Sequence, residues 1–229
     1  MRTAILQPGY LPWLGFFEQM WKSDIFVIYD NVQYTVRDWR NRNRIKTNGG
    51  IKYLTVPVGR VPRGTKINEV KIKYNTDWQT KHINSLKENY GQAPFFGRYF
   101  EPLREIISKR FECLVELDVA LIKEFNRMLG LDRKIILSSG LGIVSDGRCQ
   151  RLIEICKQVG ADTFYEGAAG KNYIDIGEFE RCGIKVDFQN YRHPIYKQPH
   201  GEFVPYLSII DLLFNEGPGS LEILIEGGS

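Results

Sequence analysis

Two side chains of this 229-residue chain, a histidine and an aspartate, are the candidates for proton transfer. His82 lies in a segment with helical spacing, and its imidazole is either a structural group or a proton acceptor, because histidine titrates at about pH 6.5. Asp30 ends an apolar run that we expect to be a strand, where a carboxylate serves as a cap or as a base. These residues are the candidate acid–base groups, with both structural alternatives open.

Gln7 and Tyr10 surround a proline and glycine corner near the start of the chain, in the stretch QPGYLPW. A fixed corner after a strand exposes polar atoms, so we predict that both side chains contact a ligand. Trp13 in the same stretch either stacks on a sugar or a base or packs in the core.

The stretch DWRNRNRIK combines guanidinium, amide and indole groups. Arginine offers paired donors to phosphate or carboxylate, asparagine both donates and accepts, and tryptophan offers a stacking face. We predict substrate contacts from Trp39, Asn41, Arg42 and Asn43, as in a sugar or diphosphate cradle. The alternative is an ordinary surface strand.

The stretch YEGAAGKNYID has the glycines that let backbone N–H groups approach a phosphate. We predict that Lys171 and Tyr173 contact substrate there. A plain connection between two elements is the alternative.

No signature of a bound cofactor or metal occurs in the sequence. The four cysteines form no C-x-x-C pair, the three histidines lack metal-ligand spacing, and the glycine-rich nucleotide motifs are absent. We therefore expect no metal and no bound cofactor. Cys149 follows Arg148 near the expected start of a helix, a position that would stabilise an exposed thiolate. It is therefore the one candidate nucleophile among the four thiols.

Apolar runs and corners predict the elements that position these residues. A strand at 3–7, a helix at about 13–22 and a strand at 25–29 form one βαβ unit, and KIILSSGLG, DGRCQRLIEICKQVGAD and TFYEG form a second. The fold class is therefore α/β, a Rossmann-like parallel sheet with flanking helices. Open sheets of this kind bind ligands at the carboxyl ends of their strands.

A small β-rich insertion at about 37–76 interrupts this pattern. TNGG predicts a hairpin turn, YLTVPV a strand, and the alternating stretch TKINEVKIKY a further strand. No linker composition separates any part, so we expect residues 1–229 to form a single domain.

Charge and apolar content limit the classes of partner. Eleven Lys and Arg residues against two acidic residues give the segment 37–73 a net charge of +9, in a chain whose total is +4. Phosphates, an acidic protein or nucleic acid would be attracted, but nucleic acid is disfavoured because no binding motif is present and the rest of the chain is acidic. No membrane span and no signal peptide are found, which predicts the cytoplasm.

Six stretches, in order along nearly the whole chain, resemble the WbqC-like family: QPGYLPWLGFF, DIFVIYDNVQY, WRNRNRIK, WQTKHI with NYGQAPFF, RLIEICKQVGADTFYEG and FVPYLSIIDLLFN. The resemblance implies an N-acyl or aminoacyl transferase of O-antigen or other surface-polysaccharide biosynthesis. The acyl group would move from a phosphopantetheine thioester on an acyl carrier protein to the amine of a nucleotide-linked amino sugar.

Under this reading, His82 is the general base and Asp30 orients it or the amine, while the predicted contact residues hold the sugar nucleotide. Direct attack on a thioester needs alignment, one proton acceptor and oxyanion stabilisation, but no metal. The alternative is a non-catalytic protein of the same pathway that binds the sugar nucleotide or the carrier protein. The oligomeric state is open, with a homodimer among the alternatives.

Overall fold

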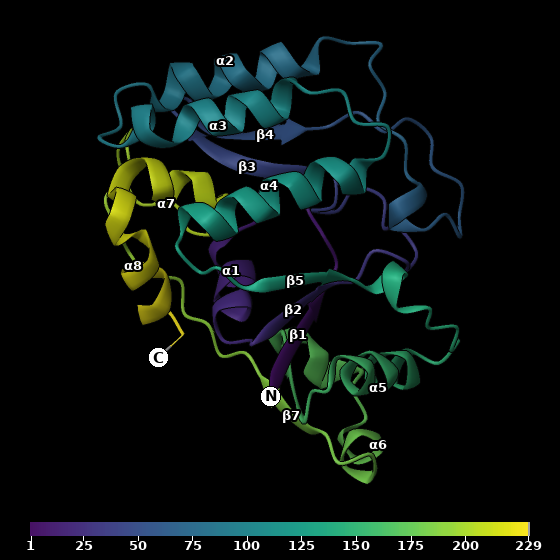
Figure 1. The fold of residues 1–229 in the computed structure, drawn as a ribbon. Coiled ribbons are helices and arrows are strands. Elements are labelled where there is room, and N and C mark those ends of the chain that lie inside the picture. Colours follow the sequence, from purple (N-terminus) through teal and green to yellow (C-terminus); the bar gives the residue numbers. More distant parts are fainter. Residues whose placement is uncertain (229) are drawn as a thin grey trace.

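A five-stranded parallel sheet forms the centre of the chain in the computed structural model, which describes residues 1–228. Its order is β5-β2-β1-β6-β7, as Figure 1 shows. The strands are β1 (Arg2–Leu6), β2 (Ile25–Ile28), β5 (Lys134–Leu137), β6 (Thr163–Glu166) and β7 (Lys185–Phe188). All four neighbouring pairs are parallel, so the predicted Rossmann-like α/β fold is confirmed.

The strand order reverses between β1 and β6. From β1 the chain passes outward to β2 on one side, whereas β6 and then β7 lie on the other side. Crossovers leaving the two central strands therefore turn in opposite directions, which opens a crevice at their carboxyl ends.

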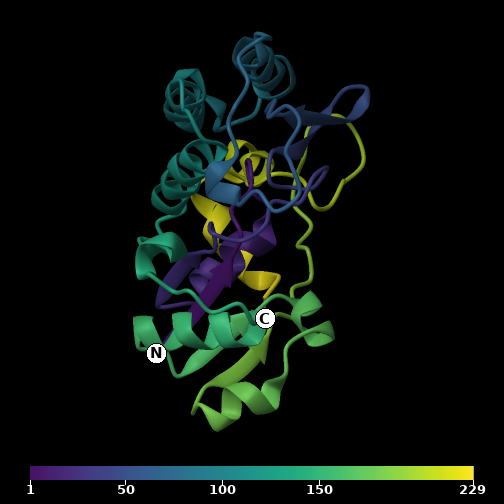
Figure 2. The ribbon, with the colours of Figure 1, turned by 90° about the vertical axis from the view of Figure 1, so that its right-hand side faces the viewer.

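Eight α-helices occur among the described residues. They are α1 (Leu14–Trp21), α2 (Trp78–Tyr90), α3 (Phe96–Ser108), α4 (Leu114–Met128), α5 (Arg148–Val159), α6 (Ile176–Arg181), α7 (Ile209–Glu216) and α8 (Ser220–Glu226). Two of them, α2 and α3, lie away from the five-stranded sheet (Figure 1). Figure 2 shows α5 and α6 on one side of the sheet, opposite the larger group of helices.

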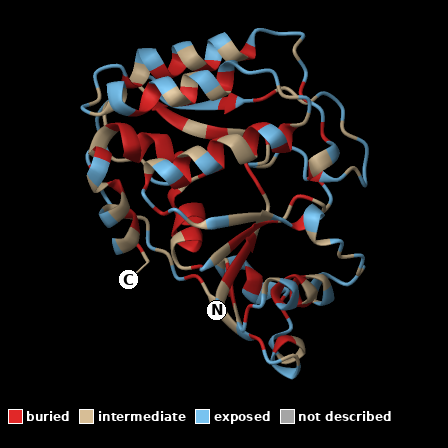
Figure 3. Cartoon of the chain, viewed as in Figure 1, coloured by how far each residue is buried: buried red, intermediate tan, exposed pale blue. Residues whose placement is uncertain are grey.

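Alternating residues of the strands divide the core in two. Ala4 and Phe26 pack with α1, α4 and α7 in the larger cluster, whereas Ile5 and Phe164 pack with α5 and α6 in the smaller one. Strand β1 lies between the two clusters, and both β1 and helix α1 are almost completely buried (Figure 3). Burial on both faces explains why β1 and β2 are continuous apolar runs in the sequence.

The insertion contains a two-stranded antiparallel hairpin, β3 (Arg42–Thr47) and β4 (Gly50–Thr55). The predicted turn is confirmed, and Gly50 adopts a φ of 107° there, a conformation that a side chain would oppose.

The prediction of a strand for TKINEVKIKY is wrong. This segment instead contains the 3₁₀ turn η1 (Ile67–Glu69) and two isolated bridges, one from Lys66 to Gln33 and one from Lys71 to Cys113. The apolar members Ile67 and Val70 are buried in the larger cluster, so their alternation reflects packing against α4 without a neighbouring strand.

Helix α3 begins at Phe96, six residues before Pro102. Phe96 stacks on Phe100 with ring centroids 4.5 Å apart and also contacts Phe214, so aromatic packing extends the helix ahead of Pro102. Within residues 1–228, no helix combines the length and apolar character needed to cross a membrane.

Candidate functional site

A cavity of about 830 Å³ opens at the carboxyl ends of the central strands. Gln7 follows β1, Tyr29 follows β2 and Glu166 ends β6, and all three line the cavity. The cavity therefore lies at the reversal point of the strand order, where open α/β sheets bind ligands.

Glu166 is a buried carboxyl group in this cavity, with 9% of its surface exposed. Its Oε1 accepts hydrogen bonds from the Gly167 amide at 2.9 Å and from the Tyr173 hydroxyl at 3.2 Å. Burial raises the pKa of Glu166 to about 7, although both hydrogen bonds lower it. The group is therefore placed to take up and release a proton near neutral pH.

Gly170 makes room for the Glu166 side chain. A Cβ atom on Gly170 would lie 2.2 Å from Cγ of Glu166, far inside normal contact distance. The glycine that the sequence suggested for phosphate approach thus allows a carboxyl side chain to lie against the turn η3 (Ala168–Asn172).

Two arginines at the start of α5 form the cationic wall of the cavity. The Arg151 Nε donates to the Ser145 carbonyl at 2.8 Å, and burial raises the pKa of Tyr29 while the nearby Arg151 charge lowers it. Arg148 lies over the Tyr173 ring, 4.8 Å from its centroid. Because no described side chain caps the first turn of α5, its N–H groups add to the attraction for an anion.

The opposite wall comes from the insertion and the opening corner. Trp39, Arg40 and Asn43 line it beside Gly9 and Trp13. Arg40 forms an ion pair with Asp38 at 3.4 Å. This wall combines an exposed indole with a partly buried guanidinium.

Gln7 presents an unusual amide at the floor of the cavity. Its Oε1 is buried, and no described protein atom donates a hydrogen bond to it. An acceptor left in this state favours a ligand that brings an N–H or O–H group. The ligand contact predicted for Gln7 stays a prediction, and its unpaired Oε1 supports that prediction.

The structure separates His82 and Tyr10 from the cavity lining. Tyr10 is fully buried, and its hydroxyl lies 2.9 Å from Nδ1 of His82, which is itself only 5% exposed and packs against Trp78. Burial lowers the pKa of His82 to about 4. This pair joins α2 to the opening corner, and the roles predicted for both residues stay untested.

Asp30 is buried at the end of β2 and is fully engaged there. It accepts hydrogen bonds from Ser138 Oγ at 2.9 Å, from Ser139 N at 2.9 Å and from Ser139 Oγ at 2.6 Å. These bonds tie β2 to the turn after β5, which matches the capping alternative for Asp30 more closely than a free base.

The amides of the insertion mainly hold the backbone together. Asn41 Nδ2 donates to the Val56 carbonyl at 2.8 Å, and Asn43 Nδ2 donates to the Leu11 carbonyl at 2.6 Å. Asn43 nevertheless lines the cavity, whereas Asn41 does not.

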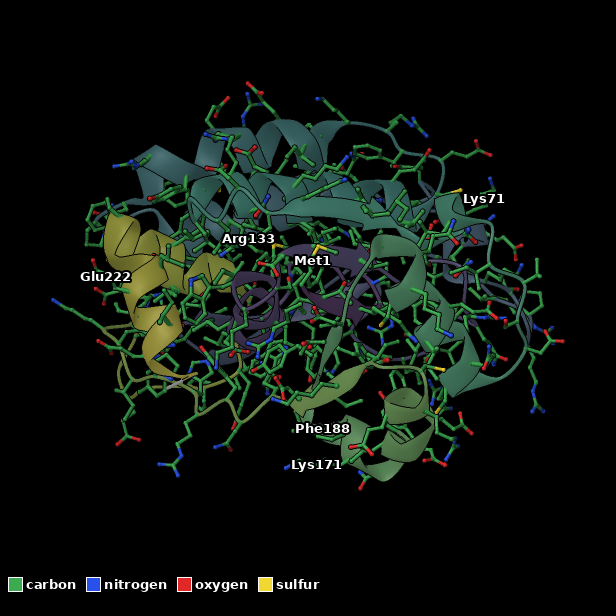
Figure 4. The ribbon with its side chains drawn as sticks, turned by 60° about the horizontal axis from the view of Figure 1, so that its bottom comes forward. Met1, Lys71, Arg133, Lys171, Phe188 and Glu222 are labelled. Atoms are coloured by element: carbon green, nitrogen blue, oxygen red, sulfur yellow. The ribbon has the colours of Figure 1, made fainter. Side chains whose placement is uncertain are left out.

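Arg42 and Lys171 also lie outside the cavity lining. Arg42 donates to the Arg37 carbonyl at 2.6 Å. Lys171 is exposed, and its Nζ lies 5.8 Å from the Phe188 ring centroid, with both side chains labelled in Figure 4. Of the predicted contact residues, the cavity therefore brings together Gln7, Trp39, Asn43 and Tyr173.

Sequence reasoning did not select Glu166, Arg148 or Arg151 as site residues. Each had a recognisable position, a strand end or the first turn of a helix. The missing information was the strand order, which places β6 next to β1 and so brings Glu166 to the same edge as Gln7.

The fold and the cavity together define an α/β protein with a carboxyl- and guanidinium-lined cavity at the switch point of a parallel sheet. The model of the WbqC-like protein family matches residues 7–223, and the chain belongs to this family. The chain is 38% identical over 223 residues to the uncharacterized protein Rv1507c of Mycobacterium tuberculosis, with 94% of each chain covered. No solved structure gives a significant match.

Proposed function

We propose that the chain is an N-acyltransferase that acylates the amine of a nucleotide-linked amino sugar, with the acyl group supplied by a carrier-protein thioester. One observation carries the proposal: a buried carboxyl group with a pKa of about 7 lies in the same cavity as the guanidinium groups of Arg148 and Arg151. The carboxylate provides a proton acceptor, and the guanidiniums suit a diphosphate.

Glu166 replaces His82 as the proposed general base. Only Glu166 of these two lines the cavity, and its pKa is close to the pH at which a cellular enzyme works. A base of this kind contributes roughly 10²- to 10⁴-fold to the rate.

The proposed reaction is a direct aminolysis. The uncharged sugar amine attacks the thioester carbonyl, so that a C–N bond forms as the C–S bond breaks. The Glu166 carboxylate takes the proton that the amine loses and returns it to the departing thiolate. The Gln7 Oε1, which lacks a protein donor, accepts an N–H or O–H group of the sugar and orients the amine.

The carrier protein would approach over the insertion. Arg60, Arg63, Lys66 and Lys73 are exposed there, and a carrier of acidic surface charge would be attracted to them. The phosphopantetheine arm is then a co-substrate that enters the cavity, and the chain itself holds no cofactor in this mechanism.

The test is an acyl-transfer assay with purified acyl-carrier thioester and an amino-sugar nucleotide. Glu166→Gln is expected to lower kcat by at least 100-fold while nucleotide binding persists. The matched control is Glu180→Gln, since Glu180 is an exposed carboxylate on α6. Equal turnover by wild type and Glu166→Gln would exclude Glu166 as the base.

His82→Gln examines the competing assignment without removing a hydrogen-bonding group from Tyr10. Retained kcat in His82→Gln and lost kcat in Glu166→Gln would favour Glu166, and the reverse result would favour His82. Saturable nucleotide-sugar binding by a wild-type chain that never turns over would support the non-catalytic alternative.

A further inference from the structure

Two exposed aromatic rings stack at the rim of the cavity. The ring centroids of Trp39 and Tyr53 lie 6.3 Å apart with their planes 23° from parallel. Trp39 is 44% exposed and Tyr53 is 49% exposed, which is unusual for side chains of this size. We call these rings, together with Arg42 and Arg44, the Trp39 platform.

The hairpin supports the Trp39 platform from one side. Arg44 and Tyr53 are paired across β3 and β4, and the Arg44 guanidinium lies 5.4 Å from the Trp39 ring centroid. Arg42 lies 5.1 Å from the centroid of Tyr53. Beside these groups 44% of the Trp39 surface stays exposed, so part of the indole is available to a ligand.

The backbone of Trp39 is fixed to the opening corner. The Tyr10 amide donates to the Trp39 carbonyl at 3.3 Å and to the Arg40 carbonyl at 3.2 Å. A Cβ atom on Gly9 would lie 2.8 Å from the Trp39 carbonyl oxygen, so the glycine permits this close approach. A ring held in place loses little conformational freedom when a ligand stacks on it.

The platform also carries positive charge. Arg42 donates to the Arg37 carbonyl and Arg44 to the Tyr206 carbonyl at 2.9 Å, and neither arginine forms an ion pair with a described residue. The exposed ring is therefore flanked by guanidiniums that are free to attract an anionic ligand.

We infer that the Trp39 platform is the subsite for the nucleobase of a nucleoside diphosphate. The base stacks on the exposed part of the Trp39 indole, and the phosphates extend into the cavity toward Arg148 and Arg151 on the opposite wall. In this arrangement the sugar, at the end of the ligand opposite the base, lies near Glu166, where the amine must be. The inference rests on the proposed function, because that function supplies the nucleotide.

The test is calorimetric titration of the full chain with UDP, GDP and inorganic pyrophosphate. Trp39→Ala is expected to weaken UDP and GDP binding by about 5- to 150-fold, because base–aromatic stacking contributes at this level. Pyrophosphate binding should be unchanged. Trp39→Phe, which keeps a smaller ring, should lose less affinity for both nucleotides than Trp39→Ala.

The control is Ile51→Ala, which removes an exposed apolar side chain from the same hairpin without touching the stack. Unchanged UDP affinity in Trp39→Ala, an equal loss for pyrophosphate, or no binding of UDP and GDP to the wild-type chain would each overturn the subsite.

Failure of the subsite and failure of the proposed function give different results. Acyl transfer with a UDP affinity that is insensitive to Trp39→Ala would leave the transferase intact and remove the base subsite. Trp39-dependent UDP binding without any acyl transfer would support the base subsite and exclude the transferase.

Discussion

At the scale of single residues, the two candidate bases differ in what surrounds them. His82 is held by the Tyr10 hydroxyl and packs against the Trp78 ring, whereas Glu166 faces a cavity with one hydroxyl and one amide on its Oε1. Burial favours the uncharged form of both groups, so it lowers the pKa of the imidazole and raises the pKa of the carboxyl. Only the upward shift produces a group that titrates near neutral pH.

The raised pKa of Glu166 predicts a specific dependence of stability on pH. The folded state holds the proton more tightly than the unfolded state, whose ordinary value is 4.5, so the free energy of unfolding falls as pH rises from about 4.5 to about 7. The loss amounts to at most about 3 kcal/mol. Glu166→Gln should therefore gain stability relative to wild type between pH 5 and pH 8.

Urea unfolding of both chains at these two pH values measures the effect. Other titrating groups cancel in the comparison because both chains contain them. The same stability difference between the chains at pH 5 and pH 8 would contradict a raised pKa for Glu166.

At the scale of elements, the opening corner illustrates how a helix can require glycine. Gly15 lies in the first turn of α1, and a Cβ atom there would lie 2.2 Å from Cη2 of the Trp13 indole. That indole lines the cavity and contacts Tyr191 and Tyr206. The glycine thus places an aromatic wall of the site directly over the helix.

Replacing Gly15 with alanine should destabilise the chain by about 1–3 kcal/mol through overpacking. Gly97→Ala is the matched control, since Gly97 lies near the start of α3 with nothing within 4 Å of the added Cβ. There the higher helix propensity of alanine should stabilise the chain by about 0.5–1 kcal/mol. Chemical denaturation of both variants measures these changes in the free energy of unfolding. A gain in stability for Gly15→Ala would refute the packing argument.

The elements were predictable where local chemistry determines them. Apolar runs gave the buried strands, and TNGG gave the hairpin turn, because these signals depend on neighbouring residues alone. The strand expected around Ile67 was wrong because alternating apolar residues can pack against a helix without a partner strand. Glu166 was not selected because its role depends on which strand lies beside β6, and only the folded sheet determines that.

At the scale of the whole molecule, the sheet is shared by both core clusters. Ile5 and Ala4 are neighbours in β1 but belong to opposite clusters. Loss of either cluster would expose one face of the same strands, so we expect the two clusters to unfold together. This expectation also tests whether residues 1–229 form a single domain.

The distribution of tryptophan makes the test straightforward. Trp13, Trp21 and Trp78 pack in or against the larger cluster and Trp39 lies at the cavity rim, so none belongs to the smaller cluster. Tryptophan fluorescence therefore reports on one side of the sheet, while far-UV circular dichroism reports on both. The two urea transitions should coincide, and a fluorescence transition displaced from the dichroism transition would indicate two separately folding parts.

The two walls of the cavity come from different parts of the chain, the insertion on one side and the sheet edge with α5 on the other. Under the proposed function, ligand choice and proton chemistry are encoded in separate segments. Exchanging residues 37–76 between two members of the family should then transfer the preference for one nucleotide over another while the recipient keeps its own pH–rate profile. Such a division would let natural selection change what is bound without rebuilding how it reacts.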